Sequence, residues 1–466
     1  MSFKSIKYPF IPLIIVIVAF VIALLSLFPI SIEEMGRGDF WVEEIIPLPY
    51  WISVIIIVCS CFFMFQHLRD HKFRYSLLFS SIILIICIRM VFPIIFTTIP
   101  AYEPDATRYI DTLNSWVNIK LDFGIPGNYQ HDFPLSFIIA FFFIKLGIPL
   151  DTFFRFAPLI VYGLIVTLLY LIIAEIHPQD KRVASVSAFL LSLSSLVGWI
   201  TWHYCPQLIG ALFFLIALLV AIKFAKKGAW TLRGILPVLI SVCLLVLSHH
   251  LSTMLFIFVI AGLTFTAWYF ESNYIKGKPL SFLIIGVFTY TFWFFYGNLM
   301  YPEFFNFAKY LIAHEVNAVS LVQQAPLIVN LTFAVYPVFI LLLSLFGLIR
   351  LLGFTRPKDF FNIIKRLNYF KKENSTMFLV YPLSFLSLGI SFVLALAIPT
   401  MQAPRFLEVF FIGLYPLASL TMLKIGQVNN SKKKFVLVLL LLILIALVSV
   451  HRYYNQDQRR VLLTMD

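Results

Sequence analysis

Four ionisable side chains stand close together in the sequence, directly after a long apolar run. They are Glu103, Asp105, Arg108 and Asp111, in a chain of which 61% of the residues are hydrophobic. Charged side chains are costly near hydrocarbon and tend to be kept for a function. A positioned carboxylate can take a proton from a hydroxyl group, and an arginine can hold an anion by charge-assisted hydrogen bonds. The cluster therefore predicts proton transfer and anion binding at the edge of a membrane.

The composition predicts an integral membrane protein. Charged residues make up 12% of the 466 residues and the mean hydropathy is +0.95, so the chain carries more apolar surface than one soluble core can bury. Apolar runs of about 20 residues, the length that a helix needs to cross a bilayer, are separated by short polar loops. The sequence lacks the alternating pattern of membrane strands, so we expect helices to satisfy the backbone inside the membrane.

The apolar runs predict an all-α, polytopic fold with about 13 transmembrane helices. The expected spans are 8–31, 50–67, 76–97, 157–176, 183–202, 207–224, 231–248, 251–270, 280–298, 327–349, 377–399, 407–423 and 435–450. The first span follows only Lys4 and Lys7 and lacks a small-residue cleavage site. We therefore interpret it as a retained helix rather than a removed signal peptide.

Lysine and arginine predict the orientation of these spans. With a cytoplasmic N-terminus, the loops on the inner side are 1–7, 68–75, 177–182, 223–233, 271–279, 350–376 and 424–434. These loops hold most of the lysine and arginine residues, as expected for the cytoplasmic side. The net charge of +13 therefore reflects topology and attraction to anionic lipid, and it requires no nucleic acid partner. An odd number of spans places the C-terminus and the segment around Asp105 on the extracytoplasmic side.

One apolar segment, 134–148, is shorter than a spanning helix usually requires. A crossing there would also move the basic loop 177–182 to the outer side and reverse the charge pattern. We therefore expect an interfacial helix within one long external loop, 98–156. Lys145 would reach from this helix toward the lipid headgroups.

The same external loop carries a helix start signal before the interfacial segment. Pro104 fits the first turn of a helix, and Asp105 beside it would lie at the positive end of the helix dipole. Asp105, Arg108 and Tyr109 would then share one helix face. The simpler interpretation is that Asp105 only caps a surface helix.

Three motifs follow one another in this part of the chain: D-x-x-R-Y at 105–109, QHDFPL at 130–135 and RFAP at 155–158. In this order they resemble the first external loop of the GT-C superfamily of polyprenyl-phosphate-dependent glycosyltransferases. The resemblance is especially to the branch of protein O-mannosyltransferases and lipid A aminoarabinose transferases. In that branch a D-E-x-R-Y-like motif precedes a K-P-P-L-like motif and an R-L-P-like span start. The recognisable likeness covers residues 98–205.

The resemblance implies a GT-C-like fold in which a long first catalytic loop contains interfacial helices. Further support comes from Y-C-P-Q at 204–207, from the LSHHLSTML stretch around His249 and His250, and from the late Arg405. The chain departs from the family by two extra spans before the motif loop and by Asp132, where relatives often carry Lys or Glu. No large soluble domain follows the last span, unlike in oligosaccharyltransferases of the superfamily.

Glycosyl transfer from a lipid phosphate requires a base for the acceptor hydroxyl and positive charge for the leaving phosphate. We predict that Asp105 is the base, assisted by Glu103, with inversion at the anomeric carbon by analogy with inverting glycosidases. The resemblance implies that Arg405 holds the phosphate. If a divalent cation takes part, Mg²⁺ or Mn²⁺ would bind Glu103 and Asp105. The other residues predicted to bind substrate are Arg108, Tyr109, His131, Asp132, Arg155, Tyr204, Gln207, His249 and His250.

Several of these residues also have a purely structural interpretation. Arg155 could be an interfacial anchor, and the segment 204–207 could cap a helix or belong to an interfacial belt. Arg89 lies inside an expected span and is either a phosphate ligand or a snorkelling side chain. Neighbouring residues of a helix diverge by about 100°, so His249 and His250 do not predict a shared metal site.

We predict an inverting glycosyltransferase of the cell membrane. Its donor is a polyprenyl- or dolichyl-monophosphate sugar, and its acceptor is a glycan, a lipid or a protein on the extracytoplasmic side. The alternatives are a polymerase or ligase for lipid-diphosphate glycans and, in a different class, a transporter or flippase, which would favour ionisable groups at the membrane midplane. The expected divisions are 1–97 (three spans), 98–156 (external catalytic loop), 157–349 (central spans with external loop 299–326), 350–376 (basic cytoplasmic loop) and 377–466 (C-terminal spans).

Overall fold

The structure of the chain is a computed structural model. It describes residues 10–28, 46–91, 94, 113–114, 134–193, 204, 206–227, 231–269, 278–300, 338–349, 403–427, 436, 438–448 and 450. Within these residues every regular element is a helix. The all-α fold class expected from the apolar runs is therefore confirmed for the described part of the chain.

The long helices follow one another in a simple order. They are α1 (Phe10–Leu27), α3 (Leu48–Gln66), α4 (His71–Arg89), α8 (Leu135–Lys145), α9 (Leu150–Ile176), α10 (Lys181–Ser192), α11 (Pro206–Lys227), α12 (Leu232–Ser248), α13 (His250–Tyr269), α14 (Lys278–Met300) and α20 (Ala403–Gln427). Shorter apolar helices include Val338–Ile349 and Val438–Val448. Each expected span overlaps a described helix except 377–399, which lies outside the described residues.

Six helices of the described residues are long and apolar enough to cross a membrane. Five of them are α1, α3, α4, α9 and α11, and the sixth covers Pro279–Tyr296 within α14. Their exposed apolar side chains are consistent with a multi-pass membrane protein, because such side chains would be costly in water. The number of crossings and the orientation of the two termini stay predictions.

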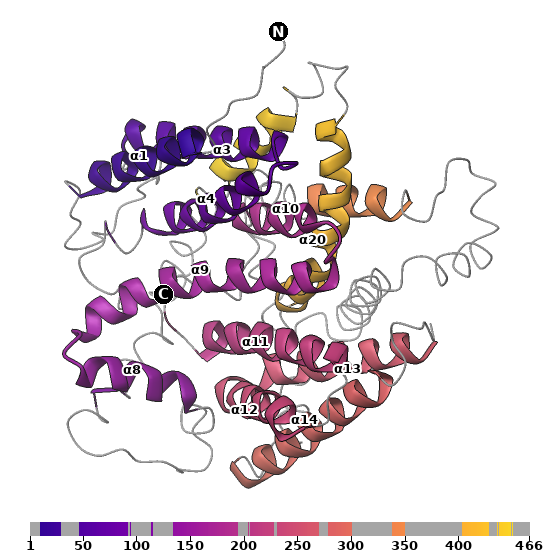
Figure 1. Cartoon of the computed structure of the whole chain (residues 1–466). Helices are drawn as coiled ribbons and strands as arrows, with labels where there is room; N and C mark the ends of the chain where they lie inside the picture. Colours follow the sequence, from indigo (N-terminus) through magenta and orange to yellow (C-terminus); the bar gives the residue numbers. More distant parts are fainter. Residues whose placement is uncertain are drawn as a thin grey trace, which may run out of the picture.

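The segment expected to be interfacial forms the 11-residue helix α8. A helix of this length is too short to cross the hydrocarbon core. Ser136, Phe137 and Ala140 are buried against the bundle, whereas Phe142 and Leu146 are exposed. Helix α8 contacts α9, α11 and α12 and lies at lower left in Figure 1. Its location at a membrane interface stays a prediction.

Proline and aspartate set several helix starts. Pro47 and Pro149 stand directly before α3 and α9, and Pro206 is the first residue of α11, positions at which the missing N–H costs nothing. The carboxylates of Asp70 and Asp180 each accept the backbone N–H two residues further on, at 2.9 and 3.1 Å, and so cap α4 and α10. These caps place polar first turns at the helix ends, outside the apolar runs.

Small hydroxyl groups join helices that are far apart in the sequence. The hydroxyls of Ser187 in α10 and Ser419 in α20 lie 2.8 Å apart. Ser344, in the helix Val338–Ile349, donates to the carbonyl oxygen of Leu414 in α20 at 3.0 Å. Serine is small enough to let neighbouring backbones approach closely in a membrane bundle. These bonds attach the late helix α20 to the central helices, as seen at the right of Figure 1.

The bundle has two ends, because most of its helices run back and forth along one direction (Figure 1). The loop end, on the left, is where α4 ends, where α9 and α11 begin, and where α12 turns into α13. We define it by Arg89, Arg155, Tyr204, Gln207 and His249. The opposite basic end we define by Arg74, Glu175, Asp180, Arg182 and Lys226.

Candidate functional site

Much of the predicted site belongs to the segment between α4 and α8, outside the described residues. The residues concerned are Glu103, Asp105, Arg108, Tyr109, His131 and Asp132. Arg405 lies in the first turns of α20, but its side chain is also outside the described part. The roles of these residues stay predictions. The structure does place Arg89, Arg155, Tyr204, Gln207, His249 and His250.

Arg89 is the last residue of α4 and is buried, with 3% of the side chain exposed. The expected span continued to residue 97, which would put Arg89 well inside a helix. The described α4 instead ends at Arg89, where a cation interacts favourably with the negative end of the helix dipole. Its guanidinium carbon lies 5.4 Å from the centroid of the Tyr162 ring in α9. Burial against this ring places Arg89 among protein groups, and the choice between a phosphate ligand and a snorkelling side chain stays a prediction.

Arg155 lies inside α9 rather than at its first residue. The expected span began at 157, but α9 begins at Leu150, directly after Pro149. One Nη1 atom of Arg155 lies 3.3 Å from Oδ2 of Asp151, one turn earlier, and the guanidinium carbon lies 5.6 Å from the ring centroid of Phe156. Hydropathy alone missed this start because the first turns of α9 carry an ion pair. The spacing of Asp151 and Arg155 in the sequence is the signal that could have revealed it.

Tyr204 connects α8 to α9. Its hydroxyl donates to the backbone oxygen of Ser136 in α8 at 2.8 Å. Its ring packs edge-on against Phe153 and Phe154 of α9, with centroids 4.8 and 5.6 Å away. With 3% of the side chain exposed, Tyr204 holds α8 and α9 together at the loop end. Its predicted contact with substrate stays a prediction beside this structural role.

His249 forms the break between α12 and α13. Its backbone is extended, with φ −168° and ψ 124°, directly before the first residue of α13. Nδ1 accepts the backbone N–H of Ser252 at 3.2 Å, which is the bond that an N-cap side chain makes. Because Nδ1 accepts this hydrogen, the ring proton of neutral His249 lies on Nε2. The apolar pattern of the sequence did not indicate this cap, although the H-x-x-S spacing of His249 and Ser252 suits it.

The two histidines were expected to be neighbours on one helix, but the structure places them differently. His249 lies in the break and His250 opens α13, with ring centroids 5.2 Å apart. Among the described residues, no three His, Cys, Asp or Glu side chains are grouped as a metal site requires. A cation bound by Glu103 and Asp105 stays a prediction.

Helix α11 packs directly on the His249 cap. A Cβ atom at Gly210 would lie 2.5 Å from Cβ of His249 and 2.7 Å from Oγ of Ser252, so only glycine fits here. Gln207 lies one turn earlier and on the same side of α11. It is 8% exposed, and its Nε2 atom is buried without a hydrogen bond to any described residue. A buried amide donor of this kind is costly unless a partner meets it, which makes Gln207 a candidate to bind a polar ligand at the loop end.

The basic end holds its charges differently. Two atoms of the Arg182 guanidinium lie 2.6 and 2.7 Å from the carboxylate of Asp180. Burial alone would raise the pKa of Asp180, but the bonds from Arg182 and the positive charges of Arg182 and Arg74 hold that pKa below its usual value. Burial lowers the pKa of His177, an effect that Asp180 partly opposes. These groups lie between α9 and α10, on the side that the sequence predicts to be cytoplasmic.

The fold has a solved counterpart, although no protein-family model and no curated protein sequence matches the chain. The crystal structure of the oligosaccharyltransferase of Archaeoglobus fulgidus in the apo form aligns with a TM-score of 0.53 and 12% sequence identity. The alignment covers 83% of this chain and 56% of that one. The two proteins share a fold. At this identity the likeness concerns the fold alone, and the chain spans little more than half the length of its counterpart.

Two further structures of the same archaeal enzyme align less well. One is tethered to an acceptor peptide with the NVT sequon, with a TM-score of 0.49 and 14% identity over 84% of this chain and 55% of that one. The other is a complex with an inhibitory peptide and a dolichol-phosphate, with a TM-score of 0.47 and 13% identity over 83% and 56%.

Proposed function

We propose that this protein is a GT-C-type glycosyltransferase of the cell membrane that uses a lipid-linked sugar donor. The observation that carries the proposal is the fold shared with an oligosaccharyltransferase over 83% of this chain. The motif order in the loop 98–156 supports it independently, because the fold comparison does not depend on these motifs. The donor is a polyprenyl- or dolichyl-monophosphate sugar, and the acceptor is a glycan, a lipid or a protein.

The loop end supplies described groups that suit this chemistry. Arg89 and Arg155 bring positive charge to the end where the motif segment leaves α4 and returns to α8, and such charge stabilises a leaving phosphate. Gln207 adds a buried amide donor beside the His249 cap. Asp105 would take the proton of the acceptor hydroxyl there, and inversion at the anomeric carbon would follow from one direct displacement.

Within the superfamily we propose the branch of protein O-mannosyltransferases and aminoarabinose transferases. The support is the sequence D-x-x-R-Y at 105–109 followed by QHDFPL and RFAP. Arg405 would hold the donor phosphate, and Glu103 with Asp105 would bind Mg²⁺ or Mn²⁺ if the reaction uses a cation. The loop end would face the extracytoplasmic side, where the charge pattern of the loops places it.

A transporter or flippase is the alternative of a different class. Transporters commonly carry ionisable groups near the middle of the membrane. In the described parts of α4, α9 and α11, the charged side chains lie in the first or last turns, as Arg89, Glu175 and Lys226 illustrate. This distribution favours a site at one end of the bundle over a path through it.

The decisive experiment is a transfer assay with the purified protein. Radiolabelled polyprenyl- and dolichyl-monophosphate sugars are offered with panels of glycan, lipid and peptide acceptors, and the anomeric configuration of any product is measured by NMR. We expect transfer from a monophosphate donor with inversion. Transfer from lipid-diphosphate glycans alone would identify the polymerase or ligase alternative. Movement of labelled lipid across a vesicle membrane without any transfer would favour the flippase and contradict the proposal.

A further inference from the structure

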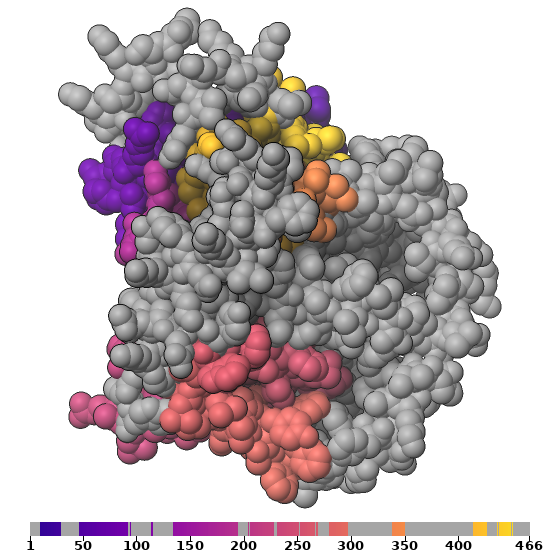
Figure 2. Space-filling view, turned by 90° about the vertical axis from the view of Figure 1, so that its right-hand side faces the viewer, coloured from indigo at the N-terminus to yellow at the C-terminus, as the bar shows by residue number. Residues whose placement is uncertain are grey.

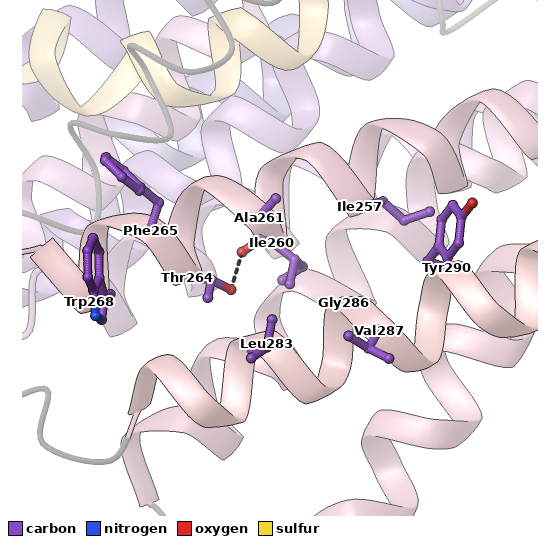
Figure 3. Close-up of a pocket in the computed structure, with 10 residues that line it drawn as sticks. All are labelled: Ile257, Ile260, Ala261, Thr264, Phe265, Trp268, Leu283, Gly286, Val287 and Tyr290. Carbon is purple, nitrogen blue, oxygen red and sulfur yellow. Dashed lines mark hydrogen bonds between the residues drawn. The ribbon is translucent and has the colours of Figure 1, made fainter.

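An open groove runs between α13 and α14 (Figure 3). Its volume is about 500 Å³, within the range of about 300–1,000 Å³ that is usual for small-molecule sites. Its walls are the stretch of α13 from Ile257 to Trp268 and the stretch of α14 from Leu283 to Tyr290. The site predicted from the loop motifs uses none of these residues.

A close approach of the two helices forms the floor of the groove. A Cβ atom at Gly286 would lie 3.2 Å from Cγ2 of Ile260, so glycine lets α14 approach α13 at this point. On either side the larger side chains of Val287 and Phe265 extend outward and are mostly exposed. The groove is therefore a hollow between two packed helices with its opening away from the bundle.

The lining fits a long apolar occupant. No side chain that lines the groove is charged. The hydroxyl of Thr264 donates to the backbone oxygen of Ile260 at 2.8 Å, the dashed line in Figure 3, and so has no proton left to donate to a ligand. The remaining polar atoms belong to Trp268 and Tyr290, which lie at opposite ends of the groove in Figure 3. An extended hydrocarbon chain meets these conditions, because it needs no hydrogen bonds along its length.

One end of the groove opens at the basic end of the bundle. Trp268 is the penultimate residue of α13, and 63% of it is exposed. Tryptophan at the end of a span typically lies at the level of lipid headgroups. At the same end, Lys227 is the last residue of α11 and Arg233 is the second residue of α12, and both are exposed. Figure 2 looks onto this end and shows the surface of α13 and α14 at the bottom, away from the N-terminal helices.

We propose that the groove between α13 and α14 binds one hydrocarbon chain of an anionic phospholipid, whose headgroup lies at the basic end. The chain occupies the apolar wall between Trp268 and Tyr290, and the phosphate interacts with exposed basic side chains such as Arg233 and Lys227. This site is separate from the proposed transfer chemistry at the loop end. It does not depend on the identity of the donor.

Photolabelling of the full-length protein tests the proposal. The protein is reconstituted in phosphatidylcholine with a trace of phosphatidylglycerol that carries a diazirine on one acyl chain, and labelled peptides are identified by mass spectrometry. We expect labelling to concentrate on 257–268 and 283–290. Val287→Trp fills the groove and should reduce this labelling about tenfold, the effect of displacing roughly two buried methylene groups. Ile284→Trp is the matched control, because Ile284 is exposed on α14 but does not line the groove.

Further variants keep the test decisive. Leu283→Trp, at the other edge of the groove, replaces Val287→Trp if that variant does not fold. The double variant Lys227→Gln/Arg233→Gln should abolish the preference for phosphatidylglycerol over a phosphatidylcholine probe with the same diazirine, while chain labelling persists. Equal labelling of the Val287→Trp and Ile284→Trp proteins would overturn the proposal. The proposal would also be overturned if a polyprenyl phosphate displaced the probe and unlabelled phosphatidylglycerol did not. The groove would then bind the lipid-linked donor and not a phospholipid.

Discussion

Arginines at the two ends of the bundle contact different kinds of group. At the basic end, Arg182 is neutralised by a carboxylate, with Nη2 2.6 Å from Oδ2 of Asp180. At the loop end, Arg89 lies over the ring of Tyr162 at 5.4 Å. The contact at the loop end joins two helices, α4 and α9, whereas the pair at the basic end lies within the first turn of α10. The first therefore contributes to helix packing and the second to the start of a helix.

Arg155 is intermediate between these two cases. It pairs with Asp151 at 3.3 Å and also contacts the ring of Phe156. If the proposed function is right, the loop end serves anion chemistry and the basic end serves the fold. Substitutions at the loop end should then lower transfer activity or disturb the elements that hold the site. Substitutions at the basic end should change stability or its pH dependence and leave activity intact.

The largest effect is expected for Asp105→Asn. If Asp105 is the base, this variant loses about 10²–10⁴-fold in kcat, because the amide cannot accept the proton of the acceptor. The melting temperature should stay unchanged. The measurement is the transfer assay at saturating donor, with Asp111→Asn as the control for a general loss of negative charge in the same segment. Full activity of Asp105→Asn would remove this residue from the mechanism.

A smaller effect on stability is expected for His249→Ala. The variant loses the bond from the Ser252 N–H that caps α13, which should cost about 0.5–2 kcal/mol. His249→Asn can make the same cap and should recover most of this stability. Both are measured by thermal unfolding in detergent. If His249→Asn restores stability but not transfer activity, the imidazole has a second role in the site. If neither variant is destabilised, the cap contributes nothing to the stability of the protein.

His177 predicts a pH dependence of the basic end. Because burial lowers its pKa in the folded protein, His177 contributes stability above its ordinary pKa of about 6.5 and this contribution is lost as the pH falls through the lowered value. Acidification from pH 7 toward pH 5 should therefore lower the melting temperature. His177→Gln should weaken this dependence, whereas transfer activity at pH 7 should persist. If the melting temperature of His177→Gln depends on pH in the same way as that of the parent protein, His177 is not the group responsible for this dependence.

The smallest effect is expected for Glu175→Gln. This change removes the carboxylate that lies 3.1 Å from Nζ of Lys226 and 3.8 Å from Nζ of Lys223. The pair is partly exposed, so the loss of stability should be about 1 kcal/mol or less and should shrink further in high salt. Activity should be unaffected. A large loss of transfer activity in this variant would argue against the division between the two ends.

Helix starts show where sequence reasoning was accurate and where it was not. The apolar runs located the helices, because a segment that must be buried in lipid has few sequence alternatives. The expected starts at 76 and 157 were too late, since α4 begins at His71 and α9 at Leu150. Their polar first turns are capped or preceded by Asp70 and Pro149, and hydropathy does not detect such signals.

For the candidate site, the sequence predicted which residue types are present but not which residues they contact. The residue types of the loop end follow from the motifs, but their partners come from elements far away in the chain. Arg89 meets Tyr162 in another helix, and Tyr204 bonds to the backbone of Ser136. No local pattern encodes such contacts, because they depend on how separate helices pack.

By itself the sequence determined that this chain is a helical membrane protein, and it marked a cluster of acids and basic groups in one loop as the place for chemistry. Hydrophobic run length and charge distribution are local properties, and they set these features directly. Only the tertiary structure decided that His249 is a helix cap, that Gly210 must lack a side chain, and that α13 and α14 enclose a groove. Each of these depends on the distance between segments that the chain brings together only when it packs.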